Sequence, residues 1–236
     1  MKTFKAFSFS SIVLFSLSLP VLADVFSVNV VGYINLPIYA GGNLIANQLY
    51  APNNTLNGLF GSGTPDGATC TKWDAVTQQF LTLSTYTSGG GWSINYDLQA
   101  GEGALFHSDS LFTNTLVGEV HGFDGENLLF NYPTVSEGTY LLSCSVPFQS
   151  DFNHVIGRDP NENESVRQLD SVNQTYHTTT FHDGAWDNGD PTLRVGESAF
   201  FTIVSPVAVI PEPNLASLFA FGLFIFGAGR MAFKKK

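Results

Sequence analysis

The chain matches itself at an offset of 96 residues, and this internal repeat constrains the fold more than any other feature of the sequence. INLPIYAGGNLI matches FNYPTVSEGTYL with Gly42 in step with Gly138. WDAVTQQF from Trp73 matches LDSVNQTY from Leu169, and LQAGEGALF later matches LRVGESAFF after a loop has lost one or two residues. Matching Gly and Pro indicate a shared backbone, because these residues mark positions with special requirements. We therefore expect two related structural units in tandem.

Each copy is expected to consist of short β-strands. Runs of strand length, bounded by Gly, Pro and Asp, recur in both copies. The expected strand regions are 43–49, 69–83 and 101–108 in the first copy and 139–146, 171–181 and 196–204 in the second. The region 69–83 alternates around a turn, and 171–181 repeats this pattern. A short helical turn, with Asn or Asp at its start and Gly at its end, is expected within 54–61 and within 151–159. The fold class is therefore all-β, with two tandem β-rich repeats that form small barrels or sandwiches.

The repeat divides the chain into five segments. A signal peptide is expected at 1–23, the first β repeat at 24–110, a bridging strand or linker at 111–127, the second β repeat at 128–206 and a sorting signal at 209–236. The stretch LFTNTLVGEVHGF within the third segment reads as an extra strand with no counterpart in the other copy. It either closes the first repeat or bridges to the second.

The N-terminus has the features of an export signal. Lys2 and Lys5 precede an apolar stretch at 6–19, and small residues then lead to a cleavage site between Ala23 and Asp24. The alternative is a retained membrane anchor, but the apolar stretch is short for a full span. We expect the mature chain to begin at Asp24 and to be exported.

The C-terminus combines three features in a fixed order. A Pro-Glu-Pro motif is followed by an apolar run at 215–229, about 22 Å long as a helix. A basic end follows, which the positive-inside bias would keep in the cytoplasm. The motif is Pro211, Glu212 and Pro213, and the basic residues are Arg230, Lys234, Lys235 and Lys236. An ordinary C-terminal anchor is the alternative interpretation.

Together these C-terminal features resemble the PEP-CTERM sorting signal of Gram-negative bacteria, over about the last 28 residues. The resemblance implies processing near the Pro-Glu-Pro motif by an exosortase, a membrane-embedded enzyme. It also implies passage through the inner membrane by way of the C-terminal helix, and then a place at the cell surface or in an exopolysaccharide-containing matrix. The repeated unit loosely resembles the duplicated β modules of bacterial surface proteins, which brings no catalytic residues with it.

The charge of the middle region excludes several partners. Between residues 24 and 209 there are 4 basic and 19 acidic residues, a net charge of −15. Nucleic acid and anionic lipid bind clusters of Lys and Arg, so that neither is an expected partner. Aromatic residues make up 14% of the chain and charged residues only 13%, a composition that is unlike that of a disordered protein.

The two cysteines, Cys70 and Cys144, lie at different positions of the repeat. Export permits a disulfide between them. Two buried thiols are the favoured alternative, because residues so unlike in position meet only if the two repeats pack suitably.

Two groups of residues offer metal ligands. The loop HDGAWDNGDP carries the calcium candidates Asp183, Asp187, Asn188 and Asp190. The EF-hand spacing is missing, and such residues are also typical of tight turns. His177 and His182 are zinc candidates that no established motif supports. No cofactor is expected.

The sequence favours a non-catalytic function. Glu102 and Glu197 are equivalent carboxylates of the two copies, and a Glu at such a Gly turn is expected to cap backbone N–H groups. Trp92 and Trp186 are expected in the cores of the copies, with sugar stacking as the alternative. We therefore expect an exported surface or extracellular-matrix protein, associated with extracellular polysaccharide. A polysaccharide-acting enzyme that uses Glu102, Glu197 or the 183–190 loop is an alternative, as is a calcium-dependent adhesive module.

Overall fold

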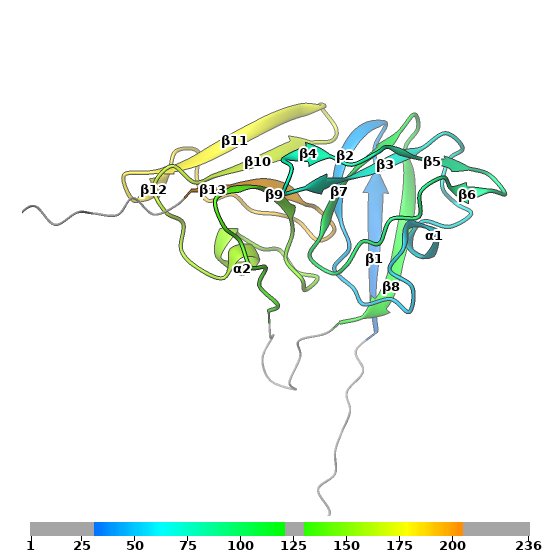
Figure 1. The fold of residues 1–236 in the computed structure, drawn as a ribbon, viewed down its shortest axis with the longest axis horizontal. Helices are drawn as coiled ribbons and strands as arrows, with labels where there is room; N and C mark the ends of the chain where they lie inside the picture. Colours follow the sequence, from blue (N-terminus) through cyan, green and yellow to red (C-terminus); the bar gives the residue numbers. More distant parts are fainter. Residues whose placement is uncertain (1–30, 121–129, 205–236) are drawn as a thin grey trace, which may run out of the picture.

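A computed structural model of the chain describes residues 31–120 and 130–204 (Figure 1). Over these two ranges the protein is all-β, with thirteen strands in three antiparallel sheets and two helices of four and five residues. Within the same ranges no helix has the length and hydropathy needed to cross a membrane. The expected signal peptide, the Ala23–Asp24 cleavage site and the sorting signal at 209–236 lie outside the described residues.

Two of the sheets share one strand order. The first runs β2 (Gly41–Ala46), β7 (Gly103–Ser108), β3 (Thr69–Asp74), β5 (Ser84–Thr87) and β6 (Gly91–Trp92), with β4 (Gln79–Phe80) also paired to β3. The second runs β9 (Gly138–Leu142), β13 (Ala199–Ile203), β10 (Ser165–Asp170), β11 (Thr175–His182) and β12 (Ala185–Trp186). In each, the first strand in sequence lies at one edge and pairs with the last strand. We call these two sheets and their helices the first and the second unit.

The third sheet has two strands and closes the first unit. β1 (Val31–Ile38) pairs antiparallel with β8 (Phe112–Glu119), beside the first unit's sheet (Figure 1). Alternate residues of the pair, including Ile34, Leu36 and Leu116, are buried in the first unit's core. Of the strand expected in 111–127, the part over Phe112–Glu119 forms and packs on the first unit, while residues 121–129 lie outside the described ranges.

Each unit contains one of the expected helical turns. In the first unit α1 (Leu56–Leu59) buries two leucines. In the second, α2 (Phe152–Ile156) begins where the Asp151 carboxylate accepts a hydrogen bond from the His154 N–H, at 3.0 Å. It ends at Gly157, whose φ of 85° is left-handed, a conformation that glycine adopts without strain.

An apolar cluster joins the two units. Strands β2 and β3 of the first unit contact β10 and β9 of the second. Three side chains from each unit meet there, namely Leu44, Trp73 and Leu105 from the first and Leu141, Leu169 and Phe200 from the second. Because strand side chains alternate between faces, Leu44 points into this shared cluster while its neighbour Ile45 points into the first unit's own core.

The strand register corrects the predicted alignment by one residue. In the first unit Leu44 lies opposite Leu105, and in the second Leu141 lies opposite Phe200. The matching residues of the two first strands are therefore 97 apart, from 44 to 141, and not 96. Gly41, with φ of 101°, takes the place that the sequence comparison gave to Gly42 as the counterpart of Gly138, with φ of 143°.

Two glutamines make the same contact in opposite directions between the units. Gln174 follows β10, and its side-chain amide accepts the Gly42 N–H at 2.7 Å and donates to the Gly42 carbonyl at 3.0 Å. Gln78 follows β3 and makes the same two bonds with Thr139, at 2.9 and 3.1 Å. Both glutamines have positive φ, 56° for Gln78 and 55° for Gln174. We call these contacts the glutamine clamps; each fastens the edge strand of one unit to a turn of the other.

Candidate binding groove between the two units

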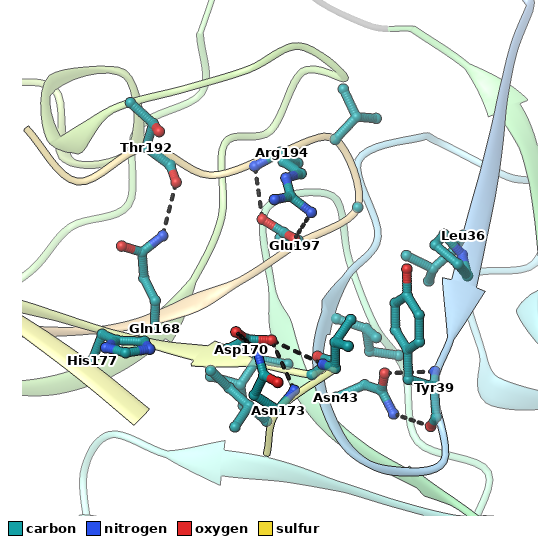
Figure 2. A pocket seen from close by; sticks show the side chains of 18 of the residues that line it. Leu36, Tyr39, Asn43, Gln168, Asp170, Asn173, His177, Thr192, Arg194 and Glu197 are labelled. Atoms are coloured by element: carbon teal, nitrogen blue, oxygen red, sulfur yellow. Dashed lines mark hydrogen bonds and ion pairs between the residues drawn. The ribbon is translucent and has the colours of Figure 1, made fainter. Parts of the chain in front are cut away.

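An open groove of about 760 Å³ lies between the units. The first unit contributes the end of β1, the turn before β2 and β2 itself. The second contributes β10, the turn after it and the segment 192–197. Figure 2 shows Tyr39 facing the segment that carries Arg194 and Glu197, with Gln168 and Asp170 below them. The volume of the groove is in the range typical of small-molecule sites.

The turn that borders the groove is held by Asp170. Its carboxylate accepts hydrogen bonds from the N–H groups of Val172 and Asn173, at 2.9 and 3.0 Å, and from the Asn173 side chain at 2.7 Å. The Asn173 side-chain bond, followed by the backbone bonds, lowers the pKa of Asp170 below its usual value. Asp170 is therefore ionised near neutral pH, which suits a structural role and is the opposite of what a general acid needs.

The two glutamates proposed for an enzyme cap backbone turns. Glu102 accepts the Gln99 N–H at 2.8 Å, and Glu197 accepts the Arg194 N–H at 2.9 Å. Each thus closes a tight turn of its own unit, as the sequence predicted for a Glu after a Gly. They differ in their cation: Lys72 Nζ lies 2.7 Å from Glu102, whereas Arg194 Nη1 lies 3.7 Å from Glu197.

Several polar groups along the groove are without hydrogen-bond partners. Within residues 31–120 and 130–204, the Tyr39 hydroxyl, the Gln149 amide and the Thr192 hydroxyl make no hydrogen bond. Tyr39 is nevertheless held in place, because its backbone N–H and carbonyl both bond to the Asn43 side chain, at 2.9 Å each. These groups are available to a ligand without breaking bonds of the fold.

The two repeated tryptophans differ in burial. Trp92 is 5% exposed in the first core, and its indole N–H donates to the Phe60 carbonyl at 3.3 Å, so the core expectation for it is confirmed. Trp186 is half-buried and packs its ring against Phe152 and Phe181. It lines a second hollow of about 510 Å³, together with Asp151 and other residues of the second unit.

The loop that carries the calcium candidates has the bonds of tight turns, the other interpretation that its sequence offered. Across the described ranges, the carboxylates of Asp183, Asp187 and Asp190 do not converge as one ligand group; Asp183 instead lies near Glu162 and His182. Asp187 accepts the Thr180 N–H and the Asn188 side-chain amide, both at 3.0 Å, which is turn chemistry. Glu162 likewise accepts the N–H groups of Asp183 and Gly184.

The two histidines of β11 lie in different surroundings. His177 borders the groove, and His182 lies 3.3 Å from both Glu162 and Asp183. Side chains five residues apart on a strand point to opposite faces, so these two cannot bind one zinc ion.

The cysteines lie in separate cores and are not bonded to each other. Cys70 is buried in the first core and Cys144 in the second, and both are free thiols. Of the two interpretations of the cysteines, the structure therefore supports two buried thiols and not a disulfide. Burial raises the pKa of Cys70 to about 12 and that of Cys144 to about 11, which makes both thiols unreactive at neutral pH.

No protein-family model, no curated protein and no solved structure matches this chain. The functional interpretation of the groove therefore depends on its geometry alone. No functional role was expected for Tyr39, Gln168 or Leu169, because none belongs to a chemical motif. A usable signal was present in the repeat, since Lys72 and Trp73 of the first copy stand where the second has Gln168 and Leu169.

Proposed function

We propose that this chain is an exported, non-catalytic protein of the cell surface or extracellular matrix, sorted through a PEP-CTERM tail and associated with exopolysaccharide. The observation that carries the proposal is the C-terminal order of Pro-Glu-Pro, apolar run and basic end, behind an N-terminal signal peptide. The chain would pass through the inner membrane by its C-terminal helix and meet an exosortase-type enzyme there. It needs no cofactor.

The folded body supports a structural or adhesive role. The carboxylates that an enzyme would use, Glu102 and Glu197, each bond to a backbone N–H of their own turn. Both side chains are 40% exposed, whereas a glycosidase acid sits in a more enclosed apolar site.

We also infer that the two units arose by duplication of one β module. The shared strand order supports this inference, as do the glutamine clamps, in which equivalent residues make equivalent bonds in opposite directions. The Asp74 and Asp170 turns have the same internal bonds, with the N–H of the valine two residues on donating at 2.9 Å in both. Such a pair has approximate two-fold symmetry, like an isologous dimer within one chain.

The experiment is intact mass measurement with cell fractionation, on the chain expressed in its own host. The proposal expects a mass that begins at Asp24 and ends near Pro211–Pro213, in the surface or matrix fraction. A double variant, Pro211→Ala with Pro213→Ala, should keep the tail and stay in the membrane fraction, while the exposed control Val76→Ala is processed normally. A wild-type chain that keeps its tail in the membrane would refute the sorting proposal.

A further inference from the structure

Approximate symmetry predicts two equivalent grooves between the units, yet the two sides differ. On the side formed by the first unit's β3, Trp73 fills the space: its indole N–H donates to the Thr139 carbonyl at 2.8 Å, and its ring packs 5.4 Å from that of Phe200. At the matching position of the second unit stands Leu169, a smaller side chain that borders the open groove. The second unit thus has a smaller side chain than Trp73 beside its groove.

A second exchange changes the cation that lies beside a carboxylate at the same groove, from Lys72 in the first unit to Arg194 in the second. In the first unit Lys72 Nζ bonds both the Asp97 carbonyl and the Glu102 carboxylate, each at 2.7 Å. In the second unit Gln168 keeps the matching carbonyl bond, to Thr192 at 2.7 Å, but brings no charge to Glu197. At these two positions β10 therefore carries an uncharged polar side chain and a smaller apolar one, while the turns and clamps around them are unchanged.

From these differences we propose that the groove binds a neutral, hydroxyl-rich oligosaccharide segment. The proposal rests on the proposed exopolysaccharide association and gives it a site. The exposed apolar surface of the groove comes from Val172 and Val195, which are 65% and 38% exposed, while Leu36 and Leu44 beneath them are each 4% exposed. A sugar ring presents C–H groups that pack on such a surface, and its hydroxyls both donate and accept hydrogen bonds.

The polar groups of the groove fit hydroxyl groups better than they fit charges. The Tyr39 and Thr192 hydroxyls and the Gln149 amide, all without partners in the described ranges, can each donate and accept. The charged groups are already engaged, since Asp170 holds its own turn and Arg194 lies beside Glu197. A charged ligand would have to compete with these contacts, whereas a neutral saccharide satisfies the free groups without disturbing them.

The test is calorimetric binding by the purified full chain in mild detergent. The probes are the neutral glucose tetramers cellotetraose, laminaritetraose and maltotetraose, with tetragalacturonate as the anionic comparison. We expect at least one neutral tetramer to bind with a Kd of about 1 mM or tighter, and tetragalacturonate to bind more weakly. Binding of none of the neutral tetramers, or a preference for tetragalacturonate, would overturn the proposal.

Matched variants locate the binding. Val172→Trp places a bulky ring in the groove, and Val76→Trp places the same ring at the matching turn position of the first unit, where Val76 is 91% exposed. We expect Val172→Trp to weaken binding about tenfold or more and Val76→Trp to leave it unchanged. Leu169→Trp, which copies the first unit's Trp73, should weaken binding similarly, with circular dichroism to check the fold. Equal loss from Val76→Trp and Val172→Trp would place the binding elsewhere and refute the groove.

The outcome separates this inference from the sorting proposal. If a neutral tetramer binds in the groove but the tail is not processed, the sorting proposal fails and the site stands. If the tail is processed and no neutral tetramer binds, the site fails and sorting stands.

Discussion

The glutamine clamps allow a quantitative test of how the two units are held together. Gln174→Ala removes the two bonds to Gly42 and a third, at 2.6 Å, to the Ser171 carbonyl. A typical hydrogen bond contributes about 0.5 to 1.5 kcal/mol net, and water replaces part of that in an exposed contact such as this one. We expect the free energy of unfolding to fall by about 1 to 2 kcal/mol. Gln78→Ala, at the matching clamp, should have a similar effect.

The same magnitudes predict that the units stay together in each single variant. Fully burying one large apolar side chain contributes about 1.5 to 3 kcal/mol, and six apolar side chains form the shared cluster. The cluster therefore outweighs either clamp. The clamps act mainly by fixing how the two sheets are aligned, because each binds both polar groups of one edge-strand residue.

Thermal unfolding of the full chain in mild detergent, followed by circular dichroism, is the assay. For a body of this size, 1 to 2 kcal/mol corresponds to a Tm lower by about 2 to 8 °C. Gln79→Ala is the control, since Gln79 is exposed, adjoins Gln78 and makes no side-chain hydrogen bond in the described ranges. If both clamp variants change the Tm no more than Gln79→Ala does, the side-chain bonds contribute nothing and the reasoning is wrong.

Three further predictions follow from buried groups. With pKa values raised to about 12 and about 11, Cys70 and Cys144 should resist iodoacetamide at pH 8 until denaturant is added; alkylation of the native chain, seen by mass, would contradict this. Burial raises the pKa of Glu164, but the bonds from Arg158, at 2.6 and 2.8 Å, and from backbone N–H groups outweigh it and hold the pKa below its ordinary value. This stabilisation is present at neutral pH and is lost as the pH falls through the native pKa. Arg158→Ala should therefore cost about 2 to 3 kcal/mol at pH 7 and move acid unfolding to higher pH, whereas an unchanged acid midpoint would refute the pairing. Trp73→Leu should cost about 2 to 4 kcal/mol in urea unfolding, more than the exposed control Val76→Leu.

Much of the local structure could be predicted because Gly, Asp and Pro mark where strands end. The Asp-x-Val-x-Gln turns after β3 and β10 were expected as turns, and both form. The contacts of their glutamines were not expected, since a side chain that crosses to the other unit depends on how two sheets pack. No local pattern carries that information.

The one-residue error in alignment has a physical cause. Sequence comparison put Gly42 in step with Gly138 because both are glycines at the start of a strand. A shift of one residue moves every side chain of a strand to the opposite face, so the choice decides which residues form the core. In the structure Leu44 corresponds to Leu141, and both lie in the shared cluster. The two units differ in length by one residue between the first strand, β2 or β9, and the helix that follows it, α1 or α2.

The groove illustrates what an internal repeat says about function. Glu102 and Glu197 drew attention as candidate catalytic residues because they recur, yet recurrence with the same backbone contact identifies them as turn caps. Positions that agree between the two units report on the fold that both must keep. Positions that differ, such as Trp73 and Leu169, are free of that requirement and report on what one unit does alone. Here a packed indole on one side of the interface corresponds to a leucine that borders an open groove on the other.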